Sequence, residues 1–169
     1  MIFLRFNLVL TTLVLSSVVT LSAKSLPQVI LKDLQNQGAT ISQFTGEQLT
    51  LINFWATYCV PCRKEMKHLQ KLQAGYADSG VTVIGVAIDG PRTANRIKST
   101  VKSNRLSYTI LLDSEQKLYG ALNTTALPFS ILVNAKGDIV WEHTGYIPGD
   151  ELAMEATVRK ELGLKPGKD

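Results

Sequence analysis

The sequence predicts a three-layer α/β fold, in which a central mixed sheet carries helices on both faces and an extra hairpin precedes it. Short apolar runs typical of buried strands alternate with longer amphipathic stretches, which indicates parallel strands joined by helices. Toward the C-terminal end, two strand-like segments are separated by only a four-residue turn, which adds an antiparallel pair. The chain has 169 residues, enough for one such domain, which we assign to residues 26–165.

The first half of the domain is expected to hold a hairpin, a buried strand, a helix and a second buried strand. Turn-forming residues at 36–38 indicate the hairpin, and near-continuous apolar runs indicate the strands. In the helix, Met66, Leu69 and Leu72 recur every three residues, opposite basic side chains. The predicted ranges are 28–34 with 39–41 for the hairpin, 49–55 and 81–88 for the strands, and 60–76 for the helix.

The second half is expected to continue with a helix, a short strand, a small helix, a hairpin and a last helix. Ser114 is predicted to cap the small helix. Residues 134–137 form a turn signal between two strands, and Gly163 is expected to end the last helix. The predicted ranges are 92–103 for the first helix, 109–112, 129–133 and 138–143 for the strands, and 149–162 for the last helix.

Residues 1–23 differ from the rest and are expected to direct export. Arg5 precedes 18 uncharged, largely apolar residues (6–23), and the segment ends in Ser22 and Ala23. This pattern is typical of a cleaved signal peptide. A retained N-terminal membrane anchor stays open as the alternative, because the apolar stretch approaches the ~20 residues that span a bilayer. Both interpretations place the domain in the periplasm or on the outer face of the cytoplasmic membrane.

The charge and cysteine content exclude several classes of function. The net charge of +4 comes without the dense Lys/Arg block of a typical nucleic-acid binder. Two cysteines are too few for a disulfide scaffold or a four-cysteine zinc site. Five basic residues do gather in 92–105 with no acid between them, and we interpret them as a solvated helix face, with docking to an acidic partner as the alternative. They are Arg92, Arg96, Lys98, Lys102 and Arg105.

The two cysteines, Cys59 and Cys62, lie between a predicted buried strand and the start of a predicted helix. A free thiol has a pKa of ~8.5, and the partial positive charge of a helix N-terminus favours its thiolate form. We therefore expect Cys59, at the very start, to be the exposed nucleophile, and Cys62, one turn further in, to be the shielded resolving thiol. Pro61 fits the first turn, whose N–H groups have no partner within the helix.

Two other roles for the cysteine pair are weaker. A structural disulfide across so short a loop would stabilise little, because the benefit grows with loop length. A metal site would need further ligands, and the two histidines, His68 and His143, have no partner at ligand spacing. We interpret both histidines as surface residues and expect neither metal nor organic cofactor. Cysteines at this spacing after a strand favour redox chemistry.

The residues around the pair resemble the TlpA/ResA-like thiol-disulfide oxidoreductases, exported members of the thioredoxin superfamily. The resemblance is strongest in residues 53–66, which read NFWATYCVPCRKEM, and extends through 85–89 and 127–140. It implies a thioredoxin-like fold and a protein-disulfide reductase activity. It also implies that Trp55, Tyr58, Leu127 and Pro128 take part in substrate binding.

The resemblance gives meaning to three positions. Pro128 matches the family's cis-proline, although base rates alone favour a trans bond, because only ~5–6% of X-Pro bonds are cis. Glu65 matches an acid beside the resolving thiol, where it would take the proton of Cys62; the alternative is a carboxylate that merely suits an early helical turn. Asn53 stands where cytoplasmic thioredoxins have a buried Asp, so proton transfer would need Glu65 or water.

Three positions depart from the family's pattern. Tyr58 stands where Trp is usual, Lys67 where Pro is often found, and Leu127 is bulkier than the typical Val or Thr. These changes affect the substrate-contacting surface and the course of the helix, while the cysteine chemistry is unaffected.

We therefore predict an exported, monomeric reductase of protein disulfides that uses Cys59 and Cys62. The resemblance implies a transmembrane electron donor of the DsbD/CcdA type and apocytochrome c as one substrate. The alternatives are a thiol oxidant or isomerase, a thiol peroxidase of the same fold, and a non-catalytic exported binding module. The chain has no room for the inserted helical domain of DsbA-type oxidants or the dimerisation arm of isomerases.

Overall fold

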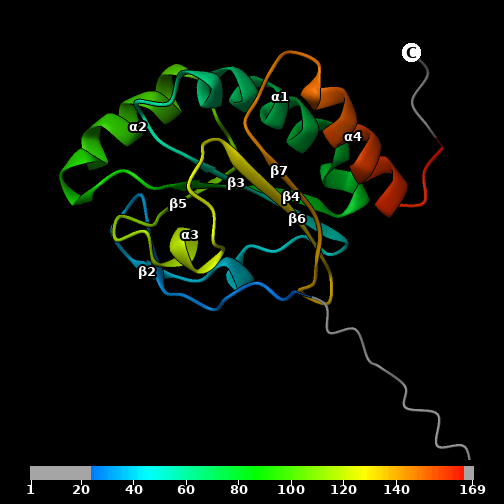
Figure 1. Ribbon diagram of the computed structural model, residues 1–169, viewed down its shortest axis with the longest axis horizontal. Coiled ribbons are helices and arrows are strands. Elements are labelled where there is room, and N and C mark those ends of the chain that lie inside the picture. The colour runs from blue at the N-terminus through cyan, green and yellow to red at the C-terminus, as the bar shows by residue number, and fades with distance from the viewer. Residues whose placement is uncertain (1–23, 166–169) are drawn as a thin grey trace, which may run out of the picture.

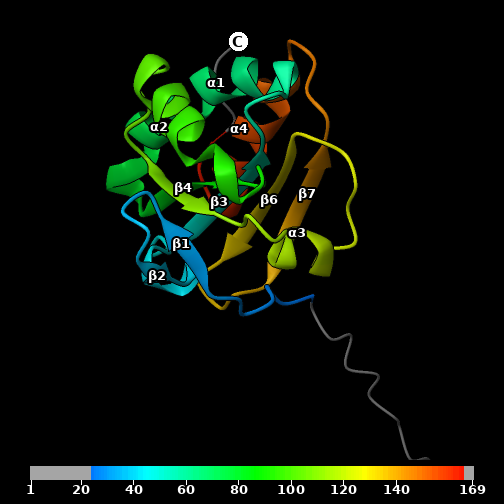
Figure 2. The same cartoon turned by 90° about the vertical axis from the view of Figure 1, so that its left-hand side faces the viewer.

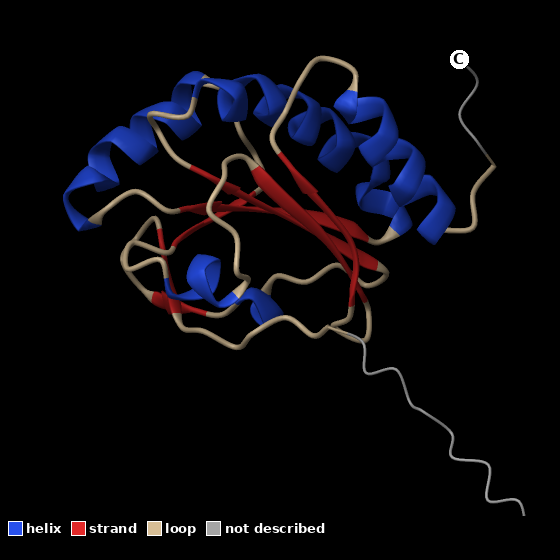
Figure 3. Cartoon of the chain, viewed as in Figure 1, coloured by secondary structure: helices blue, strands red, loops and turns tan. Residues whose placement is uncertain are grey.

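The computed structural model describes residues 24–165, which form a seven-stranded sheet covered by helices on both faces (Figures 1 and 3). The strand order is β2-β1-β5-β4-β3-β6-β7. The expected signal peptide or anchor, residues 1–23, lies outside the described residues. Among residues 24–165, no helix combines the length and apolar character needed to cross a membrane.

The predicted order of elements is confirmed, with boundaries that shift by a few residues. The strands are β1 (Leu31–Asp33), β2 (Gly38–Ala39), β3 (Leu49–Trp55), β4 (Val81–Ala87), β5 (Thr109–Leu112), β6 (Phe129–Asn134) and β7 (Ile139–Thr144). The α-helices are α1 (Val60–Tyr76), α2 (Ala94–Ser103), α3 (Lys117–Ala121) and α4 (Asp150–Glu161). Short 3-10 turns occur at Ile41–Gln43 (η1), Ala77–Ser79 (η2) and Pro91–Thr93 (η3).

The predicted three-layer arrangement is confirmed. β3, β4 and β5 are parallel neighbours, whereas β6 runs antiparallel to β3 and β7 runs antiparallel to β6. The chain steps from β3 to β4 and from β4 to β5 in the same direction across the sheet, so right-handed crossovers place α1 and α2 on the same face. Figures 1 and 2 show α1, α2 and α4 on that face and α3 on the other.

The core forms around β3, which is buried along its whole length. A strand covered on both faces is expected to be a continuous apolar run, and β3 fits this except at Thr50 and Asn53. Met66, Leu69 and Leu72 of α1 are buried against the sheet. The amphipathic pattern of the sequence therefore fixes both the position and the rotation of α1 over the cysteine-bearing end of β3.

The cap predicted at Ser114 is wrong. Helix α3 begins at Lys117, and the carboxylate of Asp113 accepts hydrogen bonds from the backbone N–H groups of Lys117 and Tyr119, at 2.8 Å each. Asp113 reaches these groups because Gln116, at the N-cap, adopts a left-handed conformation with φ of 55°. An Asp four residues before the helix thus does what the sequence assigned to the neighbouring Ser.

Candidate active site

Cys59 and Cys62 form a disulfide at the N-terminus of α1. Cys59 is the N-cap residue, and its Sγ accepts a hydrogen bond from the backbone N–H of Cys62 at 3.2 Å. Cys59 keeps 7% of its surface exposed, whereas Cys62 is completely buried. The sulfur of Cys59 therefore lies where the N–H groups of the first helical turn point, and Cys59 is the cysteine of the pair that keeps some exposure.

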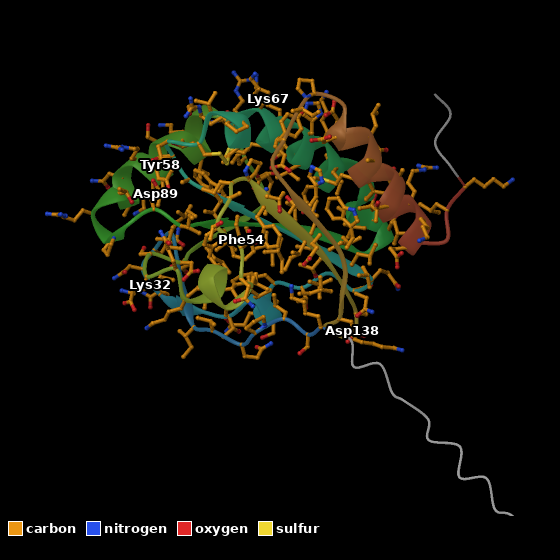
Figure 4. All side chains as sticks on the ribbon, in the orientation of Figure 1. Lys32, Phe54, Tyr58, Lys67, Asp89 and Asp138 are labelled. Atoms are coloured by element: carbon orange, nitrogen blue, oxygen red, sulfur yellow. A yellow bond between two sulfur atoms is a disulfide. The ribbon has the colours of Figure 1, made fainter. Side chains whose placement is uncertain are left out.

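The loop that carries Cys59 is fixed by a buried carboxylate, Asp89. Both oxygens of Asp89 accept from the backbone N–H of Thr57, at 2.9 and 3.2 Å, and the Thr57 hydroxyl donates to Oδ1 at 2.5 Å. The carbonyl of Thr57 accepts from Arg63 Nη1 at 2.9 Å, which ties the loop to α1 as well. Figure 4 shows Asp89 and Tyr58 at the same end of the sheet.

Asp89 was not singled out from the sequence, where it lies directly after the strand predicted at 81–88. It follows β4, the parallel neighbour of β3, so the two strands deliver Asp89 and Thr57 to the same edge of the sheet. That adjacency was the available signal, because the carboxyl ends of parallel neighbours converge at one edge.

Glu65 lies one turn beyond Cys62 and is only 1% exposed. Its Oε2 accepts from Asn53 Nδ2 at 2.7 Å and its Oε1 accepts from the Ser130 hydroxyl at 3.2 Å. Asn53 and Ser130 are direct cross-strand partners on β3 and β6. Burial raises the pKa of Glu65 to about 7, and the hydrogen bonds from Asn53 and Ser130 offset part of the rise.

Further polar groups are enclosed near Glu65. Asn53 Oδ1, Trp55 Nε1 and the Tyr108 hydroxyl are buried and make no hydrogen bond within the described part of the protein. Burial raises the pKa of Tyr108, and the negative charge of Glu65 adds to the effect, so Tyr108 keeps its proton. β3, β6 and α1 supply Asn53, Ser130 and Glu65, so a small polar region lies in an otherwise apolar core.

The Leu127–Pro128 peptide bond is cis. This agrees with what the family resemblance implied, and the trans bond favoured by base rates is wrong. Phe129 pairs with Phe54 in the β3–β6 ladder, so Pro128 lies beside the end of β3, where the chain turns toward Cys59. The carbonyl of Pro128 accepts from the backbone N–H of Gly145 at 2.7 Å, which fixes this loop against the end of β7.

The predicted substrate-binding residues differ widely in exposure. Tyr58 is 66% exposed and Leu127 is half-buried, whereas Pro128 is buried and Trp55 is completely buried. Trp55 therefore belongs to the core that supports the site, and no part of its ring is available to a substrate in this structure. Val60, which the sequence analysis did not single out, is 54% exposed directly after Cys59.

The histidines are placed differently from expectation, since both are half-buried and face acids. His143 Nε2 lies 3.2 Å from Asp150 Oδ2, and His68 Nδ1 lies 4.0 Å from Glu151 Oε1. Among residues 24–165, no group of three or more His, Cys, Asp or Glu side chains is arranged to hold a metal ion.

A thioredoxin-like sheet with a vicinal cysteine pair at the start of a helix defines the class of thiol-disulfide oxidoreductases. The profile of the Redoxin family matches residues 21–162, and the chain belongs to this family. A ResA thiol-disulfide oxidoreductase from Halalkalibacterium halodurans is 35% identical over 116 residues, which cover 69% of this chain and 64% of the relative. The predicted resemblance to ResA-like proteins is therefore confirmed.

Solved structures show the same fold. A putative thiol:disulfide interchange protein DsbE from Chlorobium tepidum superimposes with a TM-score of 0.76 at 23% identity, covering 83% of this chain and 97% of that one. A thioredoxin-like protein from Porphyromonas gingivalis gives a TM-score of 0.71 at 33% identity, covering 82% and 92%. The predicted thioredoxin-like fold is confirmed.

Proposed function

We propose that the protein reduces disulfides in extracytoplasmic proteins by thiol-disulfide exchange. In the reduced state, the Cys59 thiolate attacks one sulfur of a substrate disulfide, forms a mixed disulfide, and releases the other substrate sulfur as a thiolate. Cys62 then loses its proton and attacks the Cys59 sulfur, which frees the second substrate sulfur. Two electrons pass to the substrate, and the Cys59–Cys62 disulfide is left behind.

The position of the Cys59 sulfur carries this proposal. It belongs to the less buried cysteine of the pair and accepts the N–H of Cys62 at the start of a 17-residue helix. Free N–H groups and the helix dipole both favour negative charge at this point. Cys62, which is completely buried, is shielded from outside disulfides and suited to attack the neighbouring sulfur.

Glu65 is proposed as the group that takes the proton of Cys62. It lies three residues further along α1, a spacing that puts two side chains on one face of a helix. With a pKa raised to about 7, a substantial fraction of Glu65 is ionised at neutral pH and ready to accept a proton. Tyr58 and Leu127 are proposed to contact the substrate, with Pro128 shaping the loop that carries Leu127.

The oxidised pair must be reduced again before the next cycle, which requires a two-electron thiol donor. We propose a transmembrane donor of the DsbD/CcdA type, a disulfide of apocytochrome c as one substrate, a monomeric enzyme, and export through residues 1–23. The apolar N-terminal segment and the ResA name of the relatives support these proposals.

A trapping experiment tests the order of the two thiols. A Cys62→Ser variant is expected to accumulate a mixed disulfide between Cys59 and its substrate, because the resolving thiol is missing. The Cys59→Ser variant is the matched control and is expected to trap nothing. Trapping by Cys59→Ser in place of Cys62→Ser would contradict the assignment.

Activity assays separate the alternatives. Reduction of insulin disulfides without consumption of peroxide is expected, and the reverse result would favour a thiol peroxidase. The equilibrium potential of the pair against glutathione distinguishes a reductant from an oxidant or isomerase. A binding module would keep its cellular effect after both thiols are alkylated, whereas the proposed reductase loses it.

A further inference from the structure

A groove begins next to the cysteine pair and runs along the outer side of α1. It has a volume of about 540 Å³ and lies between the first turns of α1, the end of α2 and the loop before α4. Its lining residues are Val60, Arg63, Lys64, Lys67, His68, Asn104, Tyr146, Pro148 and Glu151. Because Val60 directly follows Cys59, a polypeptide whose disulfide reaches Cys59 has this groove within its immediate reach.

The groove carries a net positive charge. Arg63, Lys64 and Lys67 line it, and no described carboxylate lies within ion-pair distance of any of the three. Figure 4 shows Lys67 on the outer side of the helical layer. The acid in the lining, Glu151, already accepts hydrogen bonds from the Tyr146 hydroxyl at 2.7 Å and the Gly149 N–H at 2.9 Å.

Those hydrogen bonds lower the pKa of Glu151, so it is ionised at neutral pH and faces His68 at 4.0 Å. Apart from His68, three cations and one anion leave the lining with a charge of about +2. The carboxylate is engaged within its own loop and Arg63 also donates to the Thr57 carbonyl, whereas Lys64 and Lys67 are exposed and available to a ligand.

Helix α2 extends the positive charge beyond the groove. The segment that follows α2 is tied to α1 by Gln70, whose side chain donates to Ser107 Oγ at 2.8 Å and accepts from Ser107 N–H at 2.7 Å. The five basic residues predicted as a solvated face are all exposed, and none has an ion-pair partner among residues 24–165. Like charges gathered on one face raise the local potential and attract anionic partners.

We propose that this groove binds an acidic, extended segment of the substrate protein that flanks the disulfide under attack. This inference rests on the proposed reductase function and adds the class of substrate that the site selects. The exposed apolar side chains of Tyr58, Val60 and Ile147 provide contact area around the sulfur, and the cations of the groove select the charge of the flanking chain. Charge complementarity of this kind sets partner choice and the rate of association.

A polypeptide fits this surface better than an anionic membrane does. The charges line a concave groove that reaches Val60, the residue after Cys59, whereas a bilayer presents a flat surface. The described chain also begins away from this groove: the Lys24 carbonyl accepts from the Ile139 N–H of β7, and the blue start of the ribbon in Figure 1 lies across the sheet from α1 and α2.

Three disulfide peptides that differ only in the residues flanking the disulfide test the proposal: one acidic, one neutral and one basic. At low salt, the acidic peptide is expected to be reduced with a kcat/KM about tenfold above the neutral one, since two exposed ion pairs contribute about that factor. The ratio is expected to fall toward one as added salt screens the charges. In a Lys64→Glu/Lys67→Glu variant, the preference is expected to reverse toward the basic peptide.

The matched control is a Lys136→Glu/Lys160→Glu variant, which changes the net charge equally at exposed positions outside the groove. It is expected to keep the wild-type ratio. A wild-type ratio near one at low salt overturns the proposal, and so does an equal loss of preference in the control. Failure to reduce even the neutral peptide would instead contradict the reductase function.

Vesicles of phosphatidylglycerol test the membrane alternative directly. Binding that disappears in Lys64→Glu/Lys67→Glu, together with no peptide preference, would overturn the proposal in favour of a membrane contact. Absence of such binding, with the peptide preference intact, supports the substrate groove.

Discussion

Two carboxylates are buried close to the cysteine pair, and their surroundings differ. Asp89 is 3% exposed and Glu65 is 1% exposed. Asp89 receives a backbone N–H on both oxygens and a hydroxyl on one, all from Thr57. Glu65 receives one side-chain hydrogen bond on each oxygen, from Asn53 and Ser130, and burial raises its pKa to about 7.

The difference separates a structural carboxylate from one suited to proton transfer. The carboxylate of Asp89 accepts the N–H and the hydroxyl of Thr57 and so holds the loop that carries Cys59. Glu65 has too few donors to offset its burial, so it gains and loses a proton near neutral pH. Burial alone therefore does not identify the functional acid; what differs is the partner, since Asp89 binds the backbone of the Cys59 loop whereas Glu65 is held only by two side chains.

The largest effect is expected from Asp89→Ala. The substitution leaves the Thr57 N–H and hydroxyl buried without an acceptor, and unfolding free energy is expected to fall by about 2–4 kcal/mol. Urea unfolding of the oxidised protein measures the loss. Glu47→Ala, at an exposed position without an ion-pair partner in the described structure, is the control. A loss below about 1 kcal/mol would show that Asp89 does not hold the loop.

The next effect is the pH dependence of stability that Glu65 brings. Its pKa of about 7 in the folded state, against an ordinary glutamate value of 4.5, means that the folded protein binds a proton that the unfolded chain releases between these pH values. Stability is therefore expected to fall by about 3 kcal/mol as pH rises from 4.5 to 7, and to stay level above pH 7 as far as Glu65 is concerned.

A Glu65→Gln variant removes this contribution, and the difference in unfolding free energy between variant and wild type reports it. Taking the difference cancels every other titrating group that the two proteins share. The unfolding free energy of the variant is expected to rise relative to that of the wild type as pH increases from 4.5 to 7. A difference that is constant from pH 4 to 8 would show that Glu65 titrates as an ordinary exposed acid and would remove it from the proposed proton transfer.

The sequence was sufficient for most of the fold and for the cysteine pair. The apolar run at 49–55, the periodicity of α1 and the turn at 134–137 each act through local physics, and each is found where predicted. The Ser114 cap failed because Ser and Asp both cap helices, and which one reaches the N–H groups depends on a left-handed residue at Gln116.

The environment of the site was harder to predict, since it depends on strand register. The sequence indicated that Glu65 shares a face with Cys62. It did not reveal that Asn53 and Ser130 lie opposite each other across two strands and both donate to Glu65. Asp89 was missed for the same reason, because its partner Thr57 is 32 residues away in sequence.

The smallest effect is expected from Ser130→Ala. The Ser130 hydroxyl donates to Glu65 at 3.2 Å, a longer contact than the 2.7 Å bond from Asn53. Its loss is expected to raise the pKa of Glu65 by less than about one unit, because one weak donor to the charged form disappears. The carboxyl resonance of Glu65 followed by NMR measures the shift, with Ser103→Ala as a control on the surface. A fall in the pKa would contradict the described hydrogen bond.

The most direct test of the account is the ionisation of Cys59 in the Cys62→Ser variant, followed by the rate of iodoacetamide alkylation against pH. If the first turn of α1 stabilises the thiolate, the midpoint is expected at least about one unit below the ~8.5 of a free thiol. A midpoint at or above that value would show that the helix N-terminus does not activate Cys59, and the proposed nucleophile would be lost.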